Sequence, residues 1–336
     1  AYCMAGRPDH HSLGLLLTLL AAAQTIRALL DPDNPRPALV AGAWSGIGIW
    51  VSPEALIGVG ATVISFGLLW LLRPETGRAW ARLGRRFSIG MAIILLAAIL
   101  IEQPPGQWLQ AEYDKVSILH LGLALTAVVD FWIAERIRWS GPLRIAAMTV
   151  VVLISTLLLM VPFPGFYLGP LGNISNKEAM VFLDDILEMS PIWPVDRGTA
   201  DQFFGMIGNA LAALPVIPVC LHAWRREERF APVLFLSVSY LVALFGALEH
   251  QRLAVFLSAF GALLGCGLFA WICDLAEGRM QATRTVARLF AAMVVVFGGQ
   301  FWLLAPSDEA PPKAGVCDPK PVAAWLNEAH PGIATP

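Results

Sequence analysis

Long apolar segments, separated by short polar breaks, occupy most of the chain. A helix needs about 20 apolar residues to cross a bilayer, and the pattern predicts about ten such helices. The predicted helices are residues 13–30, 38–51, 55–72, 87–101, 118–133, 145–161, 204–222, 231–248, 253–273 and 286–304. An open sheet cannot satisfy its edges in lipid, so we predict an all-α, polytopic membrane protein.

The composition agrees with this fold class. The 336 residues are 57% hydrophobic and 14% charged, with a mean hydropathy of +0.65, whereas a soluble domain carries about 25% charged residues. We predict a transmembrane domain over residues 1–304 and the start of an extracytoplasmic segment over residues 305–336. The net charge of −2 gives no basic surface for nucleic acid.

The basic residues alternate between loops. Sixteen of the 23 Lys and Arg residues fall in or beside every second loop. They are Arg27, Arg36, Arg73, Arg78, Arg82, Arg85, Arg86, Arg136, Arg138, Arg144, Arg225, Arg226, Arg229, Arg279, Arg284 and Arg288. Because cytoplasmic loops are enriched in Lys and Arg, we predict that these loops are cytoplasmic and that the loops between them face outside.

A cluster of ionisable residues lies directly before the first apolar segment. Asp9, His10 and His11 stand side by side on the predicted outer face. Carboxylate oxygen and imidazole nitrogen both bind divalent cations, and such residues at a hydrocarbon boundary indicate function. The alternative is that Asp9 or Ser12 only caps the following helix.

Further ionisable residues are predicted at the same face. Glu54 lies in the break between two helices, His120 just inside another, and Arg252 at the head of a late helix. A solvated rim accounts for some polar residues there, but not for three at the hydrocarbon edge. We therefore predict that they line an outer site.

The longest outer loop covers residues 163–203. Its segment 176–189 has apolar and acidic residues at helical spacing, which predicts an amphipathic surface helix. Loops longer than about 15 residues in compact proteins are usually functional. The alternative is an interfacial helix without chemistry.

These elements resemble a known family. The run Gly6-Arg7-Pro8-Asp9-His10-His11 resembles the second acidic motif of the oligosaccharyltransferase catalytic subunit, in its archaeal and bacterial Asp-His-His form. Residues 185–191 are similar to the Ser-x-Ser-Glu-x-Gln-Pro motif of its external loop, with Glu188 at the Glu position. Gln251-Arg252 resembles its Gln-Arg element, and the three occur in family order.

The resemblance implies a GT-C membrane glycosyltransferase. Such an enzyme transfers a sugar or oligosaccharide from a polyprenyl-(pyro)phosphate donor to a protein or lipid acceptor, on the outer face of a bacterial or archaeal cell membrane, with Mn²⁺ or Mg²⁺. The resemblance and the predicted outer face together give three groups of site residues. They are Asp9 and Glu188 for catalysis, Asp9, His11 and Glu188 for the metal, and His10, Glu54, His120 and Arg252 for the substrate.

The chain departs from the family pattern at three points. The first catalytic Asp, the WWDYG-type acceptor motif and the soluble C-terminal domain are absent. We therefore expect a fragment that is inactive alone. Two alternatives stay open, a transporter or flippase and a non-catalytic scaffold subunit. Transporters place charges near the midplane, and here only Asp130 is a mid-span candidate.

Overall fold

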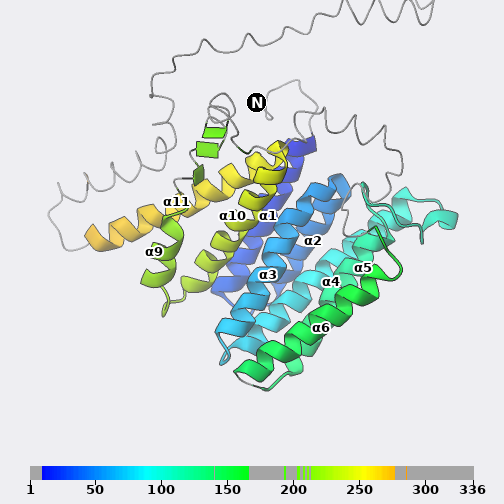
Figure 1. Ribbon diagram of the computed structural model, residues 1–336, viewed down its shortest axis with the longest axis horizontal. Coiled ribbons are helices and arrows are strands. Elements are labelled where there is room, and N and C mark those ends of the chain that lie inside the picture. Colours follow the sequence, from blue (N-terminus) through cyan, green and yellow to red (C-terminus); the bar gives the residue numbers. More distant parts are fainter. Residues whose placement is uncertain are drawn as a thin grey trace, which may run out of the picture. The chain divides into compact units, whose positions relative to one another are not determined.

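The computed structural model describes residues 10–139, 141–165 and 213–276, with a few isolated positions between 193 and 211 and at 285. All of them belong to the unit Ala1–Trp302. The helices are α1 His10–Leu30, α2 Arg36–Val51, α3 Leu56–Leu72, α4 Gly77–Glu102, α5 Ile118–Arg136, α6 Pro142–Met160, α9 Val216–Ala223, α10 Phe230–Glu249 and α11 Ala254–Ala276 (Figure 1). Short 3₁₀ turns are η1 Pro53–Ala55, η2 Pro105–Gln107 and η5 Gln251–Leu253.

These elements confirm the predicted all-α, polytopic fold. The described ranges contain no strand, and seven of their helices are long and apolar enough to cross a membrane. The helix predicted at residues 38–51 forms as α2, which begins two residues earlier and has 16 residues. The predicted helix 204–222 is represented by the eight-residue α9 and isolated helical positions, and the predicted helix 286–304 lies outside the described residues.

The tightest packing joins α2 to α4. A Cβ atom built on Gly42 would lie 1.8 Å from the carbonyl oxygen of Phe87, and one on Gly90 would lie 2.1 Å from that of Leu39. The two backbones are therefore in direct contact, and only glycine fits at both positions. Small residues of this kind let membrane helices approach closely.

One end of the bundle gathers the arginine-rich loops. Arg73, after α3, donates a hydrogen bond to the carbonyl of Arg225, and Arg144, on α6, donates one to the carbonyl of Trp70. Glu135 forms ion pairs with Arg85 at 3.0 Å and Arg82 at 3.7 Å. We call the segments 31–35, 73–76, 137–144 and 224–229 the basic end.

The intervening loops meet at the opposite end. Trp50 Nε1 donates to Glu102 at 3.0 Å, and the backbone N–H of Gly165 donates to the Tyr113 hydroxyl at 3.1 Å. Glu54 and Arg252 also meet there. We call the segments 52–55, 103–117, 161–165 and 250–253 the site end. The predicted alternation of loops between two ends is thus confirmed for the described residues.

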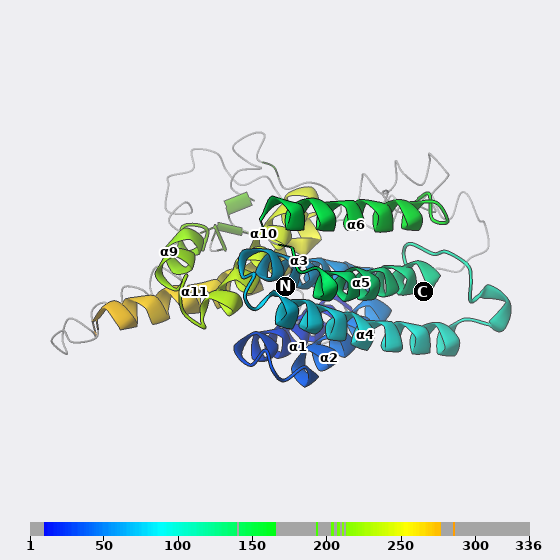
Figure 2. The ribbon, with the colours of Figure 1, turned by 90° about the horizontal axis from the view of Figure 1, so that it is seen from below.

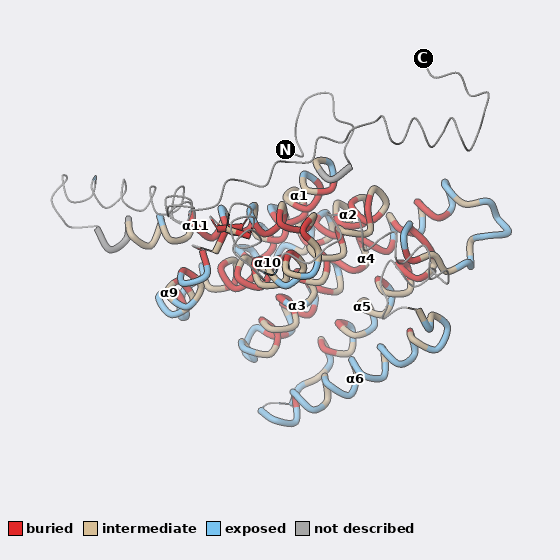
Figure 3. Tube along the Cα trace, turned by 45° about the horizontal axis from the view of Figure 1, so that its top comes forward, coloured by how far each residue is buried: buried red, intermediate tan, exposed pale blue. Residues whose placement is uncertain are grey.

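The helix α6 is attached differently from the others. It packs mainly on α5, as Figure 2 shows, and only 11% of its most apolar window is buried. The helix is drawn mostly in the exposed and intermediate colours in Figure 3, whereas α2 and α10 carry many buried residues. An apolar helix with this exposure is suited to contact with lipid.

Candidate functional site

Two short turns at the site end carry the charged residues of the candidate site. The turn η1 links α2 to α3, and the hydroxyl of Ser52 accepts a hydrogen bond from the backbone N–H of Glu54 at 3.4 Å. The turn η5 links α10 to α11 after an extended His250. The side chain of Leu253 packs against the backbone of Gly246, and this contact fixes η5 on α10.

An ion pair joins the two turns. Arg252 Nη1 lies 3.1 Å from Glu54 Oε1, and the side chains are 22% and 10% exposed. Because both groups are largely removed from solvent, each stabilises the charge of the other. Removing one partner of a buried pair lowers the free energy of unfolding by about 3–5 kcal/mol. The pair therefore holds η1 and η5 together and fixes the direction of the guanidinium.

The guanidinium of Arg252 is not saturated by this contact. Its Nε is buried and has no hydrogen-bond partner among the described groups. An arginine presents five N–H donors in a planar fork, which suits an anion with several oxygens, such as a phosphate. Arg252 is therefore a positively charged group in a fixed position that still has N–H donors for a ligand.

Only the backbone of the first residues of α1 is described. The helix α1 begins at His10 and contacts η1. The side chains of His10 and His11, and the whole of Asp9 and Glu188, lie outside the described residues. The predicted convergence of Asp9, His11 and Glu188, and the amphipathic helix 176–189, thus remain predictions.

His120 has a local partner. It is 2% exposed, and its Nδ1 lies 3.3 Å from the hydroxyl of Ser117. That hydroxyl also donates to the carbonyl of Glu112 at 2.6 Å. The described contacts of His120 thus connect the loop 103–117 to the start of α5. Its predicted contact with substrate remains a prediction.

Substitutions of Ser117 and His120 separate a structural role of His120 from a contact with substrate. We expect Ser117→Ala to lower the free energy of unfolding by about 1 kcal/mol, because a hydrogen bond is lost, and to leave binding of polyprenyl pyrophosphate unchanged. His120→Asn should have the same effect on stability, and its effect on binding tests the predicted substrate contact. Thermal unfolding and ligand titration in detergent measure both effects. Weaker binding by His120→Asn at an unchanged melting temperature would instead support a substrate contact.

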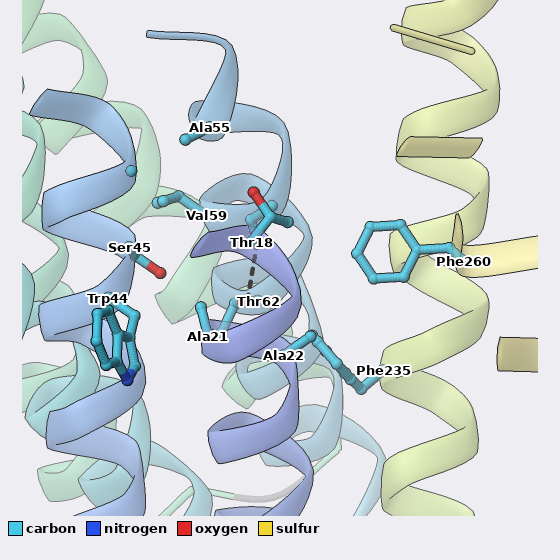
Figure 4. Close-up of a pocket in the computed structure, with 12 residues that line it drawn as sticks. Thr18, Ala21, Ala22, Trp44, Ser45, Ala55, Val59, Thr62, Phe235 and Phe260 are labelled. Carbon is cyan, nitrogen blue, oxygen red and sulfur yellow. Dashed lines mark hydrogen bonds between the residues drawn. The ribbon is translucent and has the colours of Figure 1, made fainter. Parts of the chain in front are cut away.

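A small cavity lies in the core beside η1 (Figure 4). It has a volume of about 10 Å³ and is lined by residues of five helices and by Ala55 of η1. The hydroxyl of Thr62 donates to the carbonyl of Gly58 at 2.8 Å, whereas the buried hydroxyl of Thr18 has no hydrogen-bond partner in the described part of the chain. This volume suits at most one water molecule, so the cavity is too small for a substrate.

The described residues contain no group of three His, Cys, Asp or Glu side chains placed to hold a metal ion. The side chains of the predicted ligands Asp9, His11 and Glu188 lie outside the described part of the chain. The metal site therefore remains a prediction.

The sequence matches no known family model and no curated protein. Two solved structures share its fold. One is the crystal structure of the Archaeoglobus fulgidus oligosaccharyltransferase in the apo form, with a TM-score of 0.63, 14% identity and 96% of this chain covered. The other is archaeal oligosaccharyltransferase AglB from Archaeoglobus fulgidus in complex with an inhibitory peptide and a dolichol-phosphate, with a TM-score of 0.63, 12% identity and the same coverage.

The chain has an oligosaccharyltransferase-like fold. It spans about two-fifths of the length of these structures, since 41% of each is covered. At this level of identity the likeness concerns the arrangement of helices, and it agrees with the resemblance that the sequence motifs indicated. The likeness in fold does not identify catalytic residues in this chain.

Sequence reasoning missed the pairing of Glu54 with Arg252, although it placed both at one face. The signal was present: each lies in a helix break, the breaks are at the same predicted end, and the charges are opposite. It also missed Arg144, a buried arginine on α6 whose ring partner is Trp70.

Proposed function

We propose that this chain forms the membrane part of a glycosyltransferase that takes a sugar or oligosaccharide from a polyprenyl-(pyro)phosphate donor. The observation that carries the proposal is the Glu54–Arg252 ion pair at the site end of an oligosaccharyltransferase-like fold. It supplies a fixed cation at a helix boundary, where the phosphate of a membrane-anchored donor would meet the protein.

The role of Arg252 follows from the charge that develops during transfer. As the bond between the sugar and the phosphate breaks, negative charge builds up on the phosphate oxygens. A preorganised cation stabilises that charge without having to reorient. Glu54 keeps the guanidinium in place, and the remaining N–H donors make charge-assisted hydrogen bonds to the leaving group.

The metal belongs to the same proposal. Asp9, His11 and Glu188 would hold Mn²⁺ or Mg²⁺, which supplies Lewis-acid stabilisation of phosphate oxygens when bound. Asp9 and Glu188 would act at the reacting centre, and His10 would donate a hydrogen bond to the phosphate. The support for these four roles is the motif resemblance of the N-terminal run and the external loop.

The acceptor and the membrane face are proposed on coarser grounds. The AglB structure contains an inhibitory peptide and a dolichol-phosphate, which supports a peptide acceptor and a polyprenyl phosphate carrier; a lipid acceptor is the alternative. The arginine distribution supports an extracytoplasmic site end, in the cell membrane of a bacterium or archaeon.

Substituting Arg252 tests the proposal. We expect Arg252→Ala to weaken binding of polyprenyl pyrophosphate about 10- to 100-fold, because hydrogen bonds to charged groups contribute about 1.5–3 kcal/mol. Arg252→Lys should recover only part of the loss, since an ammonium lacks the planar fork. Binding is measured by titration of the protein in nanodiscs, and transfer is measured with a lipid-linked sugar and Mn²⁺.

The matched control is Arg78→Ala, an exposed arginine near the basic end, which should bind as the wild type does. Equal losses in the two variants would indicate non-specific attraction to basic residues and would contradict the assignment.

Movement of the lipid-linked sugar across the membrane of proteoliposomes, without transfer of the sugar, would favour the flippase alternative. Asp130, its mid-span candidate, accepts a hydrogen bond from Ser155 Oγ of α6 at 2.6 Å.

A further inference from the structure

A second feature lies far from the ion pair, in the half of the bundle nearer the basic end. A groove with a volume of about 480 Å³ runs between α3, α5 and α6. Its lining is apolar and includes Ile64, Gly67, Met148 and Val152, with Asp130 as the charged exception. Ligand sites have volumes of about 300–1,000 Å³, so this groove is large enough for a molecule.

The groove opens sideways. Ile64, Val152 and Leu153 line it and are 47%, 44% and 63% exposed. All three helices qualify as membrane spans, so the opening faces the hydrocarbon of the bilayer. Apolar side chains that line an empty groove lack dispersion contacts on the open side. An apolar lipid chain can supply those contacts within the bilayer.

An arginine stacks on a tryptophan that lines the groove. The Trp70 ring lines the groove, and the guanidinium carbon of Arg144 lies 3.9 Å from the centre of that ring. Arg144 is 6% exposed, it donates to the Trp70 carbonyl, and its Nε has no hydrogen-bond partner among the described groups. Arg144 is not itself a lining residue, so the buried cation contributes through its contact with Trp70.

The surrounding surface has the same charge. Residues 73–86 and 135–144 together contain eight arginines and two glutamates. One of the glutamates, Glu135, is already paired with two arginines, whereas Arg138 is exposed. Basic pockets between membrane helices on the cytoplasmic side bind anionic lipid headgroups.

We propose that the groove between α3, α5 and α6 binds one anionic phospholipid from the leaflet at the basic end. An acyl chain fills the groove, and the headgroup phosphate lies beside the exposed Arg138, with the buried Arg144 adding positive charge nearby. The carboxylate of Asp130 is directed to α6 through its hydrogen bond from Ser155. This lipid is distinct from the proposed sugar donor, whose phosphate belongs at the site end, so the two proposals fail independently.

Two glycines of α3 provide a matched test. A Cβ atom on Gly67 or on Gly60 would have no atom within 4 Å, so both positions accept a larger side chain. Gly67 lines the groove, whereas Gly60 is outside it. We expect Gly67→Leu to fill the groove and to lower bound phosphatidylglycerol at least tenfold, and Gly60→Leu to leave it unchanged. The wild-type protein and both variants are purified in mild detergent and titrated with phosphatidylglycerol by native mass spectrometry.

Headgroup specificity is tested in the same assay. Wild-type protein should bind phosphatidylglycerol more tightly than phosphatidylcholine, and Arg138→Gln should reduce this preference several-fold. Val152→Phe serves as a second filling variant if Gly67→Leu shifts the melting temperature. Equal binding of the two lipids, or unchanged binding after both filling substitutions, would overturn the proposal. Displacement of the bound lipid by polyprenyl phosphate would also overturn it, because the groove would then belong to the donor.

Discussion

Replacing Gly42 by alanine is expected to separate α2 from α4 and to lower the free energy of unfolding by at least about 3 kcal/mol, the upper part of the usual range for overpacking. The added Cβ would lie 1.8 Å from the Phe87 carbonyl oxygen and 2.9 Å from the Met91 backbone nitrogen. Both are backbone atoms, so no side chain can rotate to make room. Thermal unfolding of the detergent-solubilised protein measures the loss.

Gly60→Ala is the control for this substitution. Gly60 is also in a membrane helix, and its added Cβ would meet no atom within 4 Å. We expect an unchanged or slightly raised stability, since alanine favours the helix by about 0.5–1 kcal/mol over glycine. Equal tolerance of alanine at positions 42 and 60 would show that α2 and α4 do not touch as described.

Removal of the Glu54 carboxylate has the second largest expected effect. Glu54→Gln should destabilise the protein by about 3 kcal/mol, because the positive charge of Arg252 stays in a mostly buried position without its partner. The same variant should reduce polyprenyl pyrophosphate binding, because the guanidinium loses the contact that orients it. Glu54→Asp, which keeps the charge on a shorter side chain, should recover part of both losses.

A double-mutant cycle measures the interaction energy between Glu54 and Arg252 apart from their contacts with other residues. The double variant Glu54→Gln with Arg252→Gln should be more stable than the sum of the single effects predicts, with an interaction energy of about 0.5–3 kcal/mol. Glu135→Gln at the basic end is the comparison, since its partners Arg85 and Arg82 are 25% and 44% exposed. Glu135 itself is 22% exposed, against 10% for Glu54, so solvent screens the Glu135 pairs more. A larger loss of stability from Glu135→Gln than from Glu54→Gln would contradict the assignment.

The apolar segments predicted most helices but not all of their ends. The prediction placed the start of the fourth helix at residue 87, whereas α4 begins at Gly77. Residues 77–86 alternate buried positions such as Trp80 and Leu83 with exposed arginines, so this part is amphipathic rather than uniformly apolar. A search for uninterrupted apolar runs leaves out such an amphipathic segment, although tertiary packing on its apolar face stabilises it as helix.

The candidate site was predictable in position but not in geometry. Helix breaks and charge placed Glu54 and Arg252 at one face, because loops of a membrane bundle alternate between its two ends. Their contact depends on how α3 packs against α10, and no local pattern encodes that distance. For His120 the sequence indicated a position at the outer face, and the structure adds a local partner, Ser117, that the sequence did not indicate.

The short α2 has a consequence for the membrane itself. Its 16 residues span about 24 Å at 1.5 Å per residue, whereas the hydrocarbon core of a typical bilayer is about 30 Å thick. Its neighbour α4 does not extend this span, because its apolar part lies between Arg86 and Glu102, and Glu102 accepts a hydrogen bond from Trp50 near the end of α2. Such hydrophobic mismatch is relieved by thinning of the adjacent bilayer. We therefore expect lipid next to α2 and α4 to be compressed, which brings headgroups of the nearby leaflet down to the level of Glu54 and Arg252.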